Sequence, residues 1–148
     1  MRTLNTTVLA LLLISAPAGA QEPDTKAARV PWANKMFVGK TDTAPPTIVH
    51  DFGVLKKGTV KEYRFEMTNI YAVPMEIQPT VLSGSLSVKD FTAKLRPNEA
   101  GHILIKIDTS KFDGRRAIRL PVVFRGTDAK SNESFFSTAE LEVWVISR

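Results

Sequence analysis

Alternation of apolar and polar side chains, repeated in seven short stretches, constrains the fold of this chain more than any other feature. In the clearest stretch, residues 60–69, Tyr63, Phe65 and Met67 share one parity, and mostly charged side chains occupy the other. A period of two is typical of a strand with one face in a core and the other in water. The pattern therefore predicts a small β-rich domain.

The other six expected strands are separated by turn residues such as glycine, asparagine and proline. They cover residues 47–53, 73–79, 86–91, 102–108, 117–126 and 139–147. Pro121 predicts an edge or a bulge in its strand, because proline cannot donate to a ladder. No stretch shows sustained helical periodicity, so the sequence predicts an all-β, seven-stranded immunoglobulin-like β-sandwich with an irregular N-terminal arm.

The core of this sandwich is expected to contain fifteen apolar side chains of like parity, each contributing about 1.5–3 kcal/mol of gross burial. The chain has no cysteine, so stability must come from this core and from strand pairing. The fifteen residues are Tyr63, Phe65, Met67, Met75, Ile77, Ile103, Ile105, Ile107, Ile118, Leu120, Val122, Phe124, Leu141, Val143 and Val145.

The start of the chain has the pattern of an export signal. Arg2 precedes a short apolar run at residues 8–14, and an Ala-Gly-Ala segment follows at residues 18–20. The run is too short to span a bilayer, which requires about 20 apolar residues. We therefore expect a signal peptide of residues 1–20, cleaved before Gln21, and a periplasmic or secreted protein without a membrane span.

Residues 21–46 contain four of the nine prolines and show no sustained period, which indicates a linker or arm before a domain at residues 47–148. Within the arm, Trp32 and Met36 are spaced to share one face of a helical turn. One interpretation is that this turn folds back over one end of the sandwich. The alternative is that Trp32, Met36 and Phe37 form a docking anchor for a partner.

Two segments carry a family resemblance: H-D-F-G-V-L-K-K-G-T-V-K-E-Y-R-F-E-M-T-N at residues 50–69 and L-R-P-N-E-A-G-H-I-L-I-K-I-D-T at residues 95–109, with W-A-N-K-M-F upstream. In order and spacing they resemble the secreted bacterial proteins grouped as "domain of unknown function 1573", over residues 32–126. The resemblance implies an extracytoplasmic immunoglobulin-like domain, related to those of cilia-associated proteins and major sperm protein. It implies little about activity.

The chain departs from that family after the third strand. Where those proteins often carry Cys-Gly-Cys, this chain has Ser83-Gly84-Ser85. Serine keeps a small turn but lacks the disulfide, metal and redox chemistry of thiols. Whatever role the family's cysteines have is therefore absent from this chain or performed differently.

Motifs for catalysis are missing from the sequence. Asp51-Phe52-Gly53 matches the magnesium-binding triplet of protein kinases, but the other kinase motifs are absent. His50 and His102 are the only histidines, whereas a zinc site takes three or four protein ligands. No hydrolase, metalloprotease or phosphate-loop motif occurs either. We therefore expect a protein that is not an enzyme and that holds no cofactor and no metal.

The last expected strand breaks the alternation, because Trp144 and Ile146 lie on the face opposite to the core. An exposed apolar patch that contains tryptophan is typical of a partner-binding surface. The alternative is that Trp32 and Phe37 of the arm cover this patch.

Basic residues gather around one predicted hairpin: Lys111, Arg115, Arg116 and Arg119. They are either a solvated turn or a site for an anionic glycan, a lipid headgroup or an acidic partner strand. The formal net charge of +5 is mild, and no nucleic-acid motif or interleaved aromatics accompany it, so nucleic acid is not an expected ligand.

The sequence as a whole predicts a non-enzymatic extracytoplasmic domain that binds or scaffolds another envelope or secreted protein, through a sandwich face or by strand addition at an edge. A carbohydrate-binding module is an alternative, for which Trp32, Trp144, Tyr63 and Tyr71 are the candidate aromatics. A pilus-type chaperone-like domain is a weaker alternative, because such proteins pair two sandwiches.

Overall fold

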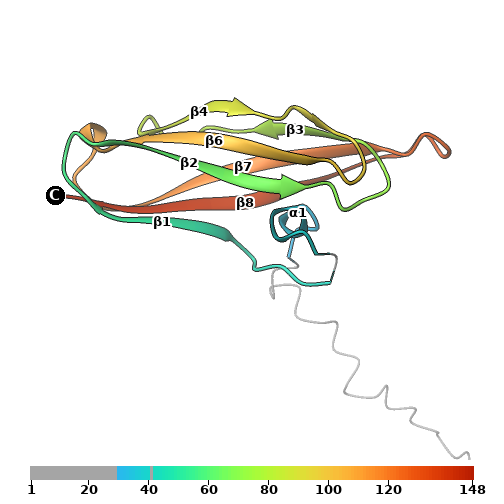
Figure 1. Ribbon diagram of the computed structural model, residues 1–148, viewed down its shortest axis with the longest axis horizontal. Coiled ribbons are helices and arrows are strands. Elements are labelled where there is room, and N and C mark those ends of the chain that lie inside the picture. The colour runs from blue at the N-terminus through green and yellow to red at the C-terminus, as the bar shows by residue number, and fades with distance from the viewer. Residues whose placement is uncertain (1–29, 41) are drawn as a thin grey trace, which may run out of the picture.

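The computed structural model describes residues 30–40 and 42–148, which form two packed sheets and a short helix (Figure 1). The predicted signal peptide lies outside the described residues. The strands are β1 (Ile48–Leu55), β2 (Val60–Thr68), β3 (Met75–Pro79), β4 (Leu86–Phe91), β5 (Lys94–Leu95), β6 (Ala100–Asp108), β7 (Gly114–Thr127) and β8 (Ser134–Ser147). The helical elements are α1 (Asn34–Val38) and the 3-10 turn η1 (Thr109–Lys111).

The larger sheet has the strand order β1-β8-β7-β3-β5, and the smaller sheet has the order β2-β6-β4. Neighbouring strands run antiparallel except for β1, which pairs with β8 in parallel. The predicted all-β sandwich is confirmed, and all seven expected strands are present. β5, which is only two residues long, is the element that the alternation did not predict, because two residues are too few to show a period.

The core follows the predicted parity. Fourteen of the fifteen expected side chains are buried, and the exception is Tyr63, which is partly exposed. Tyr63 lies on β2, an edge strand of the smaller sheet, where it stacks on His50 with ring centroids 3.4 Å apart. Edge position alone does not account for the departure, because Phe65 and Met67 of the same strand are buried.

The β7–β8 hairpin is longer than its alternation predicts, since each strand has 14 residues. Its register runs without a shift from the Gly114–Ser147 pair to the Thr127–Ser134 pair. Figure 1 shows the turn of this hairpin extending beyond the neighbouring strands. The outer part of the hairpin includes the partly buried Phe135 and the exposed Phe136, and the strands stay paired there beyond the predicted residues.

Pro121 lies in β7, which is an internal strand of its sheet and has no bulge against β8. The prediction of an edge or a bulge at this residue is therefore wrong for the sheet as a whole. It has a local basis, because the β3 ladder ends beside Pro121, at the Pro79–Val122 pair. The backbone oxygen of Pro121 accepts a hydrogen bond from the Thr80 N–H at 2.8 Å.

Candidate functional site

The helix α1 packs against one side of the sandwich, beside β2 and β8 (Figure 1). Asn34 is fully buried, and its side-chain oxygen accepts the backbone N–H of Glu140 at 3.0 Å. Its side-chain nitrogen donates to the backbone oxygens of Pro45 and Pro46 at 2.9 and 3.0 Å. Asn34 thus binds the backbone of β8 at Glu140, one residue before Leu141, where the pairing of β1 with β8 begins.

The aromatic residues of this segment pack into the domain. Phe37 makes edge-to-face contacts with Phe65 and Phe124, and Met36 is fully buried. The interpretation that the turn folds back onto the sandwich is therefore confirmed, but the turn covers the side between β2 and β8 and not an end. Because Met36 is inaccessible, the alternative of a docking anchor formed by Trp32, Met36 and Phe37 has no support in these contacts.

Trp32 packs edge-to-face on Tyr71 and Phe135, with centroid distances of 5.2 and 5.8 Å. The Tyr71 hydroxyl also donates to the Trp32 backbone oxygen at 2.9 Å. Phe135 and Trp144 are separated by nine residues of β8, which span about 30 Å in an extended strand. The prediction that Trp32 and Phe37 cover Trp144 is therefore wrong.

Trp144 lies on the outer face of the larger sheet, between Asp51 of β1 and Ala117 of β7. It is 45% exposed, and its indole N–H donates to the Glu142 carboxylate. Val49 and Val54 of β1 are 41% and 55% exposed. Together with the partly exposed Ile146, they form an apolar surface that we call the outer-face strip: Val49, Val54, Trp144 and Ile146.

A bulge in β1 shapes this strip. The register with β8 shifts between Asp51 and Val54, and Gly53 has a φ of +69°, a conformation that favours glycine. The Asp51 carboxylate accepts the Gly53 N–H at 2.7 Å. The shift brings Val54 to the same face as Val49, which simple alternation would not predict. The Asp-Phe-Gly triplet is therefore a structural bulge in this domain.

Three of the four basic residues singled out in the sequence lie in one groove. Lys111, Arg116 and Arg119 line a groove of about 740 Å³ beside β7, whereas Arg115 does not line it. Arg119 pairs with Glu140 at 2.7 Å, and this contact raises the pKa of Arg119 further. The Arg116 guanidinium lies 5.9 Å from the centre of the Phe112 ring. The groove also contains Ser83, Gly84 and Ser85 of the predicted turn, where the two hydroxyls are 2.8 Å apart.

The two histidines are in different places. Burial lowers the pKa of His50, which packs on Tyr63 and Phe52. His102 contacts the Asp90 carboxylate at 2.8 Å, and this hydrogen bond lowers the pKa of Asp90. Within residues 30–40 and 42–148, no group of three or more histidine or carboxylate side chains could hold a metal ion. In the same part of the chain, no helix has the length and hydropathy needed to cross a bilayer.

No protein-family model matches this chain, and comparison with curated proteins finds no similar sequence. Among solved structures, the VesB protease of Vibrio cholerae matches with a TM-score of 0.51 and 17% identity, over 66% of this chain. The chain spans only 30% of that protease chain. The likeness to the protease, at this identity, concerns the fold alone.

Two further solved structures are similar at lower scores. PapD-like domain 7 of human CEP192 has a TM-score of 0.49 and 12% identity, covering 74% of this chain and 93% of that domain. The E. coli chaperone DraB has a TM-score of 0.45 and 15% identity, covering 68% of this chain and 52% of the chaperone. The two-sheet architecture of the described residues defines the class, an immunoglobulin-like sandwich domain.

Proposed function

We propose that this protein is a non-enzymatic extracytoplasmic domain that binds or scaffolds another envelope or secreted protein through the outer face of its larger sheet. The observation that carries the proposal is the outer-face strip, in which Trp144 is 45% exposed next to exposed valines of β1. A tryptophan with apolar neighbours on a rigid surface is typical of the centre of a protein interface.

The surroundings of Trp144 fit such an interface. Its indole ring is oriented by the Glu142 carboxylate, so little side-chain entropy remains to be lost on binding. Asp51 and Arg119 lie in neighbouring register positions on the same face and supply a polar rim. The strip therefore combines an apolar centre with charged residues that can select a partner.

The location outside the cytoplasm is the part of the proposal that depends on sequence. It is supported by the export-signal pattern of residues 1–20 and by the resemblance to the secreted proteins of "domain of unknown function 1573".

The aromatic residues favour a protein partner over a glycan. Sugar-binding sites commonly use aromatic rings that form one platform, since each ring stacks on a sugar face. Here Trp32 packs against Tyr71, and Tyr63 stacks on His50. Trp144 is consequently separate from the other three candidate aromatics of a carbohydrate-binding module.

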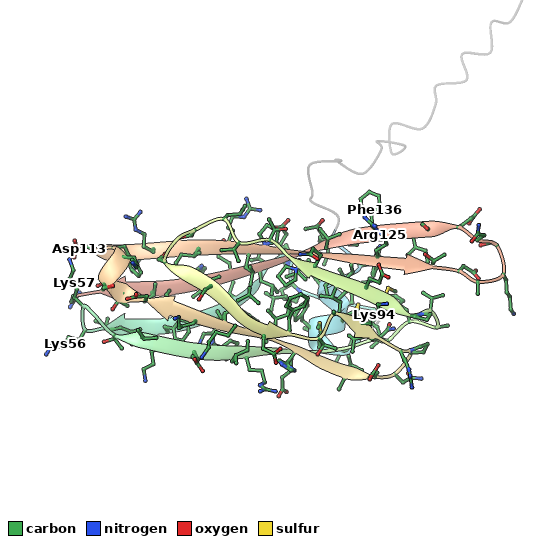
Figure 2. The ribbon with its side chains drawn as sticks, turned by 90° about the horizontal axis from the view of Figure 1, so that it is seen from above. Lys56, Lys57, Lys94, Asp113, Arg125 and Phe136 are labelled. Atoms are coloured by element: carbon green, nitrogen blue, oxygen red, sulfur yellow. The ribbon has the colours of Figure 1, made fainter. Side chains whose placement is uncertain are left out.

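A crosslinking experiment in the native envelope tests this proposal. A photoreactive amino acid is placed at position 144 and, as a control, at Phe136, which is 74% exposed on the same face. Phe136 pairs with Arg125, far from the Lys57–Asp113 ion pair that marks the other end of the sandwich (Figure 2). We expect a discrete protein adduct from position 144 only.

The matched substitutions make the result specific. The partner identified by crosslinking is then recovered by affinity purification without a crosslinker. Trp144→Ala should abolish this recovery, whereas Phe136→Ala should leave it unchanged. Equal recovery with both variants would contradict the proposal. Retention on a glycan array that Trp144→Ala abolishes would favour the carbohydrate-binding alternative instead.

A further inference from the structure

The β7 strand has an unpaired segment inside the larger sheet. β3 pairs with β7 over Val122–Gly126, and the Thr80 N–H donates to the Pro121 oxygen, so residues 115–120 of β7 have β8 on one side and no strand on the other within the described residues. Beyond Thr80 the chain leaves the sheet and crosses to β4 in the opposite layer. An unpaired ladder of this kind can accept an additional strand.

The direction of the backbone groups on this segment follows from one hydrogen bond and from strand geometry. Pro121 directs its backbone oxygen away from β8, toward Thr80. Alternate residues of a strand direct their N–H and C=O groups to the same side. Ala117 and Arg119 therefore present backbone donors and acceptors to the unpaired side, next to the groove that they also line.

The charge of the groove is positive. Its lining contains Lys111, Arg116 and Arg119 but no acidic residue. Among the described residues, Arg119 is paired with Glu140, whereas neither Lys111 nor Arg116 has an acidic group within 4.0 Å. The groove thus has two cations available for carboxylates of a ligand.

The groove also has apolar side chains. Leu82, at the rim, is 66% exposed, and Ala117 is exposed opposite Trp144. A ligand strand with one acidic face and one apolar face would match both properties. A small anion would use the cations but would leave the backbone groups and the apolar side chains unpaired.

We propose that an extended acidic segment of a partner protein adds as a strand to β7 along residues 115–120, antiparallel to β7 as β3 is, with its carboxylates on Lys111 and Arg116. This inference deepens the proposed function by naming the chemistry of a partner, and it does not require the outer-face strip. The β3 strand already shows the geometry, since the added segment would continue its line beyond Thr80.

The test uses a short fluorescent peptide of alternating glutamate and valine, with binding measured by anisotropy at low salt. We expect saturable binding that weakens as salt increases. A peptide with lysine in place of glutamate should bind at least about tenfold more weakly. Absence of binding by the glutamate peptide, or equal binding by the lysine peptide, would overturn the inference.

Backbone methylation tests strand addition separately from charge. In the proposed arrangement the valines lie opposite Ala117 and Arg119, so their N–H groups donate to β7, whereas those of the glutamates point away. N-methylation at the valines should weaken binding at least about tenfold, and N-methylation at the glutamates should have a much smaller effect. Equal binding by both methylated peptides would overturn strand addition.

Substitutions in the protein locate the site. Lys111→Glu and Arg116→Glu should each weaken binding about tenfold, whereas Lys61→Glu, an equal charge change on exposed β2, should not. Lys111 is exposed on η1, so its variant remains informative if Arg116→Glu disturbs the packing on Phe112. Equal affinity of the Lys111→Glu variant and wild type would contradict the assignment of the groove. Trp144 is unchanged in these variants. Failure of the peptide to bind would therefore contradict the strand-addition site alone, and failure of crosslinking at position 144 would contradict the outer-face strip alone.

Discussion

The two strands of the long hairpin differ in how their outer edges are covered. The edge of β8 is paired by β1 from the Ile48–Leu141 pair onward, and next to it Asn34 accepts the Glu140 N–H. The edge of β7 is paired by β3 over only part of its length and, within the described residues, is open along residues 115–120. At this end of the hairpin, the edge of β8 is thus closed from Glu140 to Ser147, whereas the edge of β7 is open at the facing residues 115–120.

This difference separates the residues that maintain the fold from those available to a partner. The closed edge is sealed by buried groups, such as Asn34 and Met36, which are fully inaccessible. The open edge carries exposed cations and apolar side chains around a groove. Proteins generally cover or interrupt open edges, because unpaired ladders associate with other chains. An edge left open beside a positive groove is therefore suited to binding.

The largest effect is expected at the closed edge. Asn34→Ala removes the acceptor of the Glu140 N–H and the donor to Pro45 and Pro46, leaving buried polar groups without partners. We expect a loss of about 3 kcal/mol in the free energy of unfolding, measured by urea denaturation. Ser83→Ala, at the open edge, should change it by less than about 0.5 kcal/mol. Similar losses in the two variants would contradict the distinction between the edges.

A second pair of substitutions compares the covered and open parts of β7. A Cβ added at Gly126 would lie 2.6 Å from the Phe135 ring and 3.0 Å from the Met75 sulfur. Gly126→Ala should therefore destabilise the protein by about 1–3 kcal/mol through overpacking. Gly84, in the open groove, has no neighbour within 4 Å of such an atom. Gly84→Ala should be nearly neutral, and thermal unfolding of both variants measures the difference.

The pairing of β1 at the closed edge should also be sensitive to acid. Burial lowers the pKa of His50 from its usual 6.5, so the unfolded chain takes up this proton at a higher pH than the folded protein. The free energy of unfolding should therefore fall as the pH decreases below about 6.5.

His50→Phe should remove this part of the acid sensitivity while keeping a ring against Tyr63. Urea denaturation at about pH 7.5 and about pH 5 compares the variant with wild type. Asp90 and Asp108 have pKa values below 3.8, so their stabilisation is lost at lower pH than this window. An equal fall in both proteins would contradict the assignment to His50.

The smallest effect on stability is expected on the outer face of β8. Trp144→Ala should change the free energy of unfolding by less than about 1 kcal/mol, because the side chain is 45% exposed. Leu141→Ala, on the inner face of the same strand, should cost about 2–5 kcal/mol. A large loss for Trp144→Ala would show that this tryptophan stabilises the fold, which would weaken its role as a binding residue.

The sequence predicted the strands other than β5, because each one repeats the same alternation of apolar and polar side chains. Tyr63, Phe65 and Met67 have the parity that β2 requires, and the same rule held for the other long strands. It did not predict the bulge at Gly53, since one inserted residue reverses the parity of Val54 without changing the composition. The period of alternation therefore gives the strands but not their irregularities.

The candidate binding surfaces were only partly predictable. Trp144 was found because it breaks the alternation of its own strand. The open edge of β7 depends on where β3 ends, which is a property of the pairing and not of either strand alone. Pro121 was the local signal, since proline marks a position whose N–H is not needed in the ladder. Sequence gave no indication that Lys111 and Arg116 would share a groove with Ser83–Ser85.

Amide hydrogen exchange along the hairpin tests the contrast between the two edges most directly. The measurement follows the backbone amides of Glu140 and Trp144, which face the covered edge of β8, and those of Ala117 and Arg119, which face the open side of β7. We predict slow exchange at Glu140 and Trp144 and fast exchange at Ala117 and Arg119, because among the described residues only the first two amides have an acceptor on the facing element. Equal protection of all four amides would contradict an open edge on β7.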